Sequence, residues 1–235
     1  MKRIVMLCII VASAAMAYSQ SYVGVNVGYA QPITRLNLPV MGKESVLNPT
    51  YYNGMKVGVV YDVTLIKGLG VSMGLNYTMG GNATDWKSKS SSIKYPQERS
   101  RGWYHQLEIP VDWQYKFQIA KDTWLMLYTG PTLQCGLSLQ KKNYVNDGKT
   151  VEMNAKNPTD NLYDADDTGV FALKRLNVTW GVGAGFQYER YFLRGGYDFG
   201  IINPYKVDSF TGQDIYTRGR FDQWQVKLGM YLWQF

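Results

Sequence analysis

Charged side chains that recur within apolar stretches are the residues of this chain best suited to chemistry. They fall at alternate positions, so in an extended strand they would share one face with small polar neighbours. Carboxylates and cations gathered in a narrow space form either a packed network of ion pairs or, with water between them, a path for ions or protons. An unpaired buried charge is costly, which favours the packed network. The candidates are Lys56, Asp62, Glu108, Asp112, Lys116, Glu189, Arg194 and Asp198, with Lys227 as a further member.

The single histidine, His105, is the residue that would suit acid–base catalysis. Its position along the chain matches that of Leu107 and Ile109, so its side chain should lie on the apolar face and not in a polar pocket. No Gly-x-Ser-x-Gly elbow supports a nucleophile, because the one match to this pattern, at residues 70–74, lies within an alternating strand and not at a strand-to-helix turn. We therefore expect no enzymatic activity.

A group of acidic residues, Asp160, Asp164, Asp166 and Asp167, precedes Gly169. Alternating carboxylates are typical of calcium loops, but these lack the glycine at the sixth position and the distal glutamate. We interpret the group as a solvated loop. The sequence accordingly predicts no metal site and no cofactor.

The elements that would position these residues are strands with two opposite faces. From Leu69 to Gly80, large apolar residues alternate with Gly, Ser, Asn and Thr. Similar alternation through the chain predicts an all-β fold of about eight antiparallel strands. Their expected ranges are 22–31, 52–63, 69–80, 103–117, 124–140, 175–189, 191–202 and 220–235.

The lengths of the connections indicate which face is the inside. Long connections (32–51, 81–102, 141–174 and 203–219) alternate with short ones (64–68, 118–123 and the reversal around Arg190). This asymmetry is typical of an up-and-down transmembrane barrel, with tight periplasmic turns and long outer loops. The apolar face, including Met73, should then touch lipid, while the charged residues fill a narrow interior. The alternative is a secreted soluble barrel that binds a lipophilic ligand, with its apolar face inside.

The composition agrees with a single membrane barrel. The chain has 235 residues, 46% of them hydrophobic, and 14% aromatic, with 19 Tyr and 7 Trp. No segment offers the roughly twenty consecutive apolar residues of a membrane-spanning helix, whereas interfacial aromatic girdles would use many Tyr and Trp. The net charge of +7 is spread over loops and strands, so we expect no nucleic-acid partner.

The first residues have the pattern of a secretory signal peptide. Basic Lys2 and Arg3 precede an apolar stretch, and Ala15-Met16-Ala17 resembles a cleavage site. We expect a cleaved signal peptide at 1–17 and an exported barrel domain at 18–235. Cys135 would then be the one cysteine of the mature chain, which leaves no intramolecular disulfide.

Irregular pairing is expected at three places in the strands. Pro110 and Pro131 each remove a hydrogen-bond donor from a ladder, so we predict a bulge or irregularity near each. In the segment 224–235, Trp233 and Phe235 fall on the opposite face from Val226 and Leu228. We predict a bulge there as well, because terminal aromatic residues of such strands normally face lipid.

Several segments resemble a known family. The run Leu107-Glu108-Ile109-Pro110-Val111, the strand containing Gly74-Leu75-Asn76-Tyr77 and the aromatic strand ending in Phe235 look like the small PorT-like outer-membrane β-barrel family, of the OmpA, OmpX and OmpW type. The resemblance implies an integral protein of the cell outer membrane, without enzymatic activity. It also implies a structural or accessory role, in secretion or cell-surface assembly, through exposed loops. A narrow channel or a transporter of hydrophobic compounds is the alternative.

The expected partners follow from this location. A basic stretch in the second long connection should attract lipopolysaccharide, next to outer-membrane lipid around the barrel. Its residues are Lys87, Lys89, Lys94, Arg99 and Arg101. The last strand, ending in Phe235, should be read by the barrel-assembly machinery, and the outer loops should offer sites to protein partners.

Overall fold

The computed structural model describes residues 20–40, 43–46, 49–66, 68–90, 93–153, 161–164, 173–205, 208–210, 213–215 and 218–235. Within these ranges, no helix is long and apolar enough to cross a membrane. The predicted signal peptide lies outside the described residues, as do Asp160, Asp166 and Asp167.

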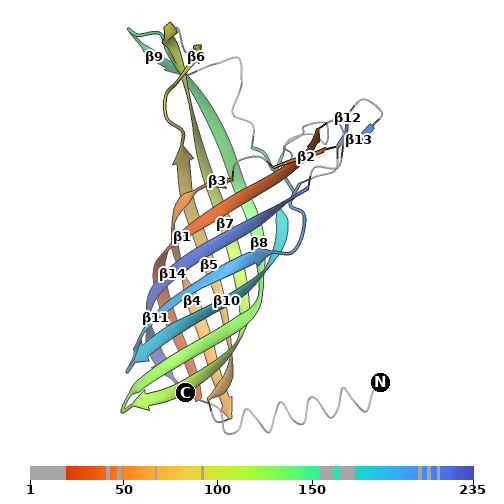
Figure 1. Cartoon of the computed structure of the whole chain (residues 1–235). Coiled ribbons are helices and arrows are strands. Elements are labelled where there is room, and N and C mark those ends of the chain that lie inside the picture. Colours follow the sequence, from red (N-terminus) through yellow and green to blue (C-terminus); the bar gives the residue numbers. More distant parts are fainter. Residues whose placement is uncertain are drawn as a thin grey trace.

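Among the described residues, eight long strands form a closed antiparallel barrel (Figure 1). Each pairs with the next in chain order, and the last pairs with the first, so the ring has no open edge. The fold class predicted from the alternation is confirmed. The strands are β1 (Gln20–Val40), β4 (Asn53–Ile66), β5 (Leu69–Ala83), β7 (Ile93–Ala120), β8 (Thr123–Asn146), β10 (Leu176–Tyr188), β11 (Tyr191–Gly200) and β14 (Arg218–Gln234).

The two ends of the barrel differ as the connection lengths predict. At one end, tight turns join β4 to β5, β7 to β8 and β10 to β11. Asp122 and Glu189 adopt left-handed backbone conformations in two of these turns, with φ of 57° and 50°. At the other end lie the long connections, which contain short strands. These are β2 (Lys43–Val46), β3 (Thr50–Tyr51), β6 (Lys87–Ser90), β9 (Val151–Met153), β12 (Asp208–Phe210) and β13 (Gln213–Ile215).

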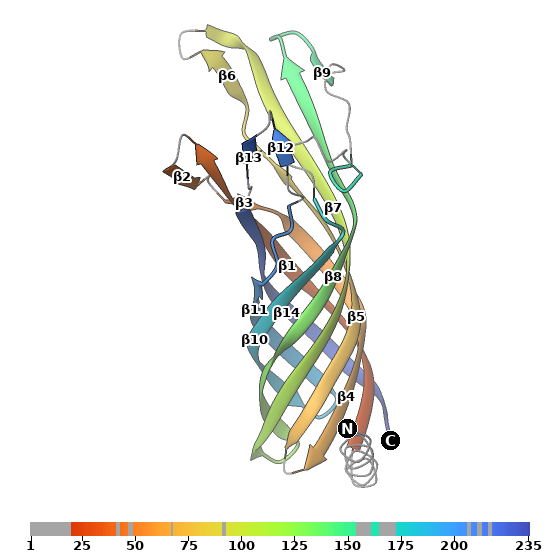
Figure 2. The ribbon, with the colours of Figure 1, turned by 90° about the vertical axis from the view of Figure 1, so that its right-hand side faces the viewer.

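β7 and β8 continue well beyond the barrel mouth (Figures 1 and 2). Their pairing extends to Gln97 opposite Asn146, with β6 added along β7 and β9 along β8. We call β6, β9 and the projecting parts of β7 (93–101) and β8 (141–146) the outer sheet. The strands predicted from the sequence were shorter, beginning at 103 and ending at 140. Beyond these positions polar residues fall on both faces, which removes the alternation.

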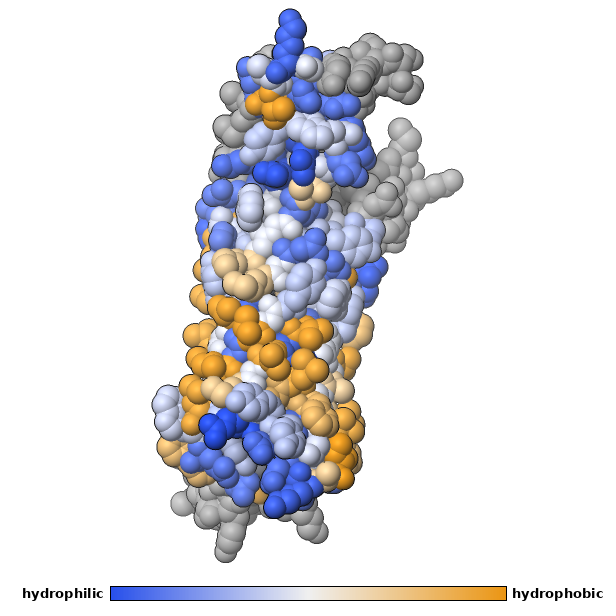
Figure 3. Space-filling model, turned by 90° about the vertical axis from the view of Figure 1, so that its left-hand side faces the viewer, coloured by the Kyte–Doolittle hydropathy of each residue, from blue (hydrophilic) through white to orange (hydrophobic). Residues whose placement is uncertain are grey.

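The polar face of each strand points into the barrel. Along β5, Leu69, Met73 and Leu75 are exposed on the outer wall, whereas Asn76 and Thr78 are buried inside. This confirms the predicted faces, and it is the reverse of the packing of a soluble barrel. On the side seen in Figure 3, hydrophobic residues form a band across the barrel, with hydrophilic residues on both sides of the band.

The predicted irregularities are present. Val23 pairs with Trp233 and Gly24 with Tyr231, so Leu232 is an extra residue in β14. Because of this bulge Tyr231 is buried inside, at 5% exposure, while Trp233 lies outside at 59%.

Near the two prolines the irregularity takes a different form. Between β7 and β8, Pro110 pairs with Thr132 and Trp113 pairs with Thr129, in the same register. The two pairs that should lie between them, one of which would include Pro131, are not formed. The prolines interrupt a ladder without adding a residue.

Candidate functional site

The part of the barrel interior nearer the tight turns is built around Arg194 of β11. Its guanidinium lies 2.5 Å from the Asp62 carboxylate of β4 and donates to Ser72 Oγ of β5 at 2.8 Å. Tyr231 of β14 accepts from Arg194 at 3.2 Å and donates its own hydroxyl proton to Asp62. All four side chains are buried. One ion pair with its hydrogen bonds therefore joins strands from opposite sides of the barrel.

Lys116 of β7 completes this group, which we call the Asp62 cluster. Its ammonium lies 3.5 Å from Asp62 and donates to Gln187 Oε1 at 3.1 Å. It also lies over the rings of Tyr22 and Tyr231, 5.2 and 5.4 Å from their centroids. Cation–π contacts of this kind stabilise a charge that has few waters around it.

A second group, the Glu108 cluster, lies nearer the outer mouth. Glu108 of β7 is 2.5 Å from Lys56 Nζ of β4 and accepts from Thr78 Oγ1 of β5 at 2.6 Å. Lys56 also donates to Gln225 Oε1 at 2.6 Å, and Gln225 donates to Asp198 at 2.8 Å. These hydrogen bonds run across the barrel from β7 to β11, so this level is filled by polar side chains as well.

Asp112 and Lys227 lie between the two clusters, both buried at 6% exposure. With Arg194 and Asn26 they line a cavity of about 10 Å³. A space of that size holds about one water molecule.

The outer mouth is covered by an aromatic cap that the sequence did not predict. Tyr104, Leu139, Tyr163, Leu173 and Tyr205 pack together there, and Tyr52, Leu162 and Phe221 pack against them. The cap is held by backbone hydrogen bonds at 3.0 Å, from Leu162 N to Leu139 O and from Leu173 N to Leu162 O. Burial raises the pKa of Tyr163 to about 12, because the phenolate would lose its hydration inside the cap.

Glycines in the strands make room for the cap. A Cβ atom at Gly136 would lie 2.1 Å from the Tyr163 ring, and one at Gly219 would lie 2.3 Å from the Tyr205 ring. The apolar pair Leu162-Tyr163 inside a polar connection was the available signal. The residues against which this pair packs, however, are determined by tertiary contacts, which no local sequence pattern indicates.

The structure places seven of the eight predicted charged residues inside the barrel, together with Lys227. Glu189 is the exception, and its prediction was wrong. β10 ends at Tyr188, and the left-handed conformation of Glu189 turns it out of the strand to an exposed position beside Asp122. Uncharged partners were missed: Ser72, Thr78, Gln187, Gln223, Gln225 and Tyr231.

His105 lies half-buried on the outer face of β7, as its position predicts. Its Nδ1 is 2.6 Å from the Tyr77 hydroxyl, and the two rings are stacked with centroids 6.0 Å apart. The described member of the acidic group, Asp164, forms an ion pair with Arg175.

A closed barrel with an apolar outer wall, a polar interior and long connections at one end defines an outer-membrane β-barrel protein. The chain belongs to the family described as outer membrane protein beta-barrel domain, whose model matches residues 16–205.

Three solved structures are similar to this chain at low identity. Ail, the attachment invasion locus protein of Yersinia pestis, in complex with the heparin analogue sucrose octasulfate, is 12% identical, with 92% of this chain and 99% of that chain covered and a TM-score of 0.38. Neisserial surface protein A is 11% identical, with 90% and 97% covered and a TM-score of 0.40. The N-terminal β-barrel domain of Pseudomonas aeruginosa OprF is 9% identical, with 90% and 99% covered and a TM-score of 0.31. A search of curated proteins found no match.

Proposed function

We propose that the protein is a non-enzymatic structural or accessory component of the outer membrane that acts through its extracellular side. The filled interior supports this most directly. The Asp62 cluster, the Glu108 cluster and the aromatic cap follow one another along the barrel, each joined by contacts between different strands. A barrel filled in this way is a rigid anchor for whatever projects from it.

The outer sheet is the part that projects. In the described residues β6 and β9 each pair on one side, so their other edges offer free backbone groups to a partner. The PorT-like resemblance supports a role in secretion or cell-surface assembly with protein partners bound there. Insertion through the barrel-assembly machinery, by the strand ending in Phe235, belongs to the same proposal.

Conductance tests the anchor against a channel. Purified protein in planar lipid bilayers should give no stepwise current, because the interior is filled. The variant Tyr104→Ala/Tyr163→Ala/Lys56→Ala/Glu108→Ala/Arg194→Ala removes the centre of the cap and side chains from both clusters, and should conduct, which shows that the assay detects an open barrel. Stepwise current from the parent protein would contradict the proposal and favour a narrow channel.

Affinity capture from native membranes tests the role of the outer sheet. Thr84 N donates to Ser100 O at 2.9 Å, and Gln140 forms a β-bridge with Asn161, so short linkers can replace 86–99 and 142–159. The shortened protein should still fold into the barrel but lose the partners that the parent captures. Retention of the same partners would contradict a role for the outer sheet.

A further inference from the structure

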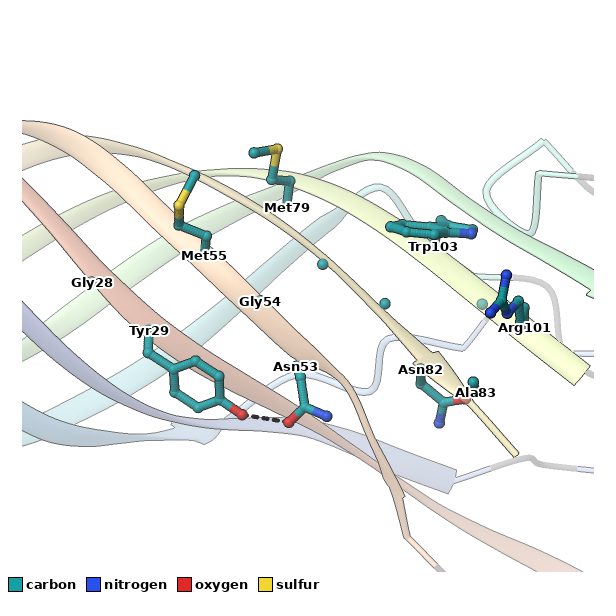
Figure 4. Close-up of a pocket in the computed structure, with 13 residues that line it drawn as sticks. Gly28, Tyr29, Asn53, Gly54, Met55, Met79, Asn82, Ala83, Arg101 and Trp103 are labelled. Carbon is teal, nitrogen blue, oxygen red and sulfur yellow. Dashed lines mark hydrogen bonds between the residues drawn. The ribbon is translucent and has the colours of Figure 1, made fainter. Parts of the chain in front are cut away.

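A groove runs along the outer wall of the barrel below the outer sheet, on β1, β4, β5 and β7 (Figure 4). It has a volume of about 780 Å³. Its floor is glycine backbone, including Gly54, Gly80 and Gly81. Of these, Gly81 is an outward position, whereas a Cβ at Gly54 would point inward and lie 2.1 Å from the buried Tyr104 hydroxyl. The groove therefore exists because Gly81 has no side chain and Ala83 a small one, where the rest of the wall carries large apolar ones.

The two ends of the groove differ in chemistry. Met55 and Met79 lie at the membrane end, and Arg101 lies at the end toward the outer sheet, with Trp103 between (Figure 4). On β5 the outward positions run Met79, Gly81, Ala83, and Ala83 pairs with Arg101. Two residues of strand span about 7 Å, so the guanidinium begins about 14 Å above the methionines along the strand.

Aromatic side chains form the walls. Tyr29 stands on one side, with its hydroxyl bonded to Asn53, and Trp103 stands on the other, 52% exposed and leaning over Gly81. Tyr and Trp are the residues that concentrate where the hydrocarbon of a bilayer meets the headgroups. Their level places the methionines at the edge of the hydrocarbon and Arg101 among the headgroups.

The cations at the upper end have no acidic partner. Arg101 pairs directly with Lys142 across β7 and β8, and cross-strand partners share a face of the sheet. No ion pair joins either of them to an acidic side chain within the described residues. On the same face, Arg99 lies over the Trp86 ring, and its buried Nε has no hydrogen-bond partner in the described part of the chain. Like charges directly opposite each other are destabilising unless an anion lies between them.

We propose that this groove binds a phosphorylated, acylated lipid of the outer leaflet, namely the lipid A part of lipopolysaccharide. A phosphate bridges Arg101 and Lys142, and one acyl chain lies over the glycine floor between Tyr29 and Trp103. The charge complementarity selects an anionic lipid, and the position on the side of the outer sheet selects the outer leaflet. The proposal rests on the outer-membrane location alone and not on the accessory role proposed above.

Native mass spectrometry of the detergent-solubilised protein tests this with two probes, hexa-acylated diphosphoryl lipid A and its dephosphorylated form. The dephosphorylated lipid should bind at least about tenfold more weakly, since it loses charge-assisted hydrogen bonds to both cations. Arg101→Gln/Lys142→Gln should weaken binding of the diphosphoryl lipid by a similar factor. The matched control Lys141→Gln/Lys149→Gln removes the same charge from positions outside the groove and should bind as the parent does.

A second pair of variants tests the acyl-chain site without changing charge. Ala83→Phe fills the groove beside Gly81 and should weaken binding several-fold, whereas Ala184→Phe adds the same ring to the outer wall on β10 and should have no effect. Equal binding of the two lipids, or equal binding by Arg101→Gln/Lys142→Gln and its control, would overturn the proposal. Equal loss of lipid A binding in Ala83→Phe and Ala184→Phe would show that the lipid does not bind in the groove.

Discussion

At the scale of single residues, this barrel is held from within by charge. Arg194 and Asp62 form one buried ion pair, and Ser72, Tyr231 and Lys116 each contact one or both of them. Desolvating two ions costs free energy that their attraction offsets only when the remaining hydrogen bonds are made. Here Asp62 Oδ2 and both terminal nitrogens of Arg194 have partners, whereas Asp62 Oδ1 and Arg194 Nε have none within the described residues. Breaking the pair should therefore cost more free energy than the pair itself contributes, because it leaves a buried ion without its partner.

A double-mutant cycle measures this. Asp62→Leu alone leaves Arg194 and Lys116 without their shared carboxylate and should lower the free energy of unfolding by about 3–5 kcal/mol. Arg194→Met/Asp62→Leu should cost less than the sum of the two single changes, because one of the two uncompensated cations is also removed. Urea unfolding in lipid vesicles gives both values. Additive losses from the two substitutions would contradict a coupled pair.

Strand parity predicted most of these inward residues, because successive side chains in a strand alternate between two faces. Lys56, Asp62 and Arg194 are inside for that reason. Parity failed for Glu189, since a turn conformation follows from the local backbone and not from alternation. It also could not pair the charges, because partners such as Asp62 and Arg194 are 132 residues apart in sequence.

At the scale of elements, the bulge in β14 reconciles two incompatible patterns. Leu232 is the extra residue, and it lets Tyr231 face the interior while Trp233 and Phe235 face outward. The alternation in the sequence already indicated an irregularity, but the partner strand was needed to locate it between Val23 and Gly24.

Single-residue deletions test the position of the bulge. Without Leu232 the strand becomes regular, and Tyr231 and Trp233 keep their faces, so the folded fraction should match that of the parent. Without Leu228 the residues that follow change faces, and Tyr231 loses Arg194 and Asp62. Heat-modifiable gel mobility reports the folded fraction. A deletion of Leu232 that is as harmful as that of Leu228 would show that the bulge lies elsewhere.

At the scale of the whole molecule, the protein is an outer-membrane barrel that carries a projecting sheet and an exterior groove. Alternation and connection lengths predicted the barrel because both arise from the repeated crossing of one bilayer. The outer sheet and the aromatic cap escaped prediction, because the former is polar on both faces and the latter depends on contacts between Tyr163, Tyr205 and distant strands. The groove was not predicted, because the small outward residues Gly81 and Ala83 form a site only once β5 is aligned with the strands that carry Tyr29 and Trp103.

The central claim is that the apolar face of each strand meets lipid and the polar face is enclosed. The most direct measurement compares Met73→Arg with Leu69→Arg by unfolding in lipid vesicles. Both residues are exposed on the outer face of β5, Met73 toward the middle of the bilayer and Leu69 at its periplasmic edge. Arginine should cost about 2–4 kcal/mol at Met73 and about 0–1 kcal/mol at Leu69. If Met73→Arg is as stable as the parent, the faces are assigned the wrong way round.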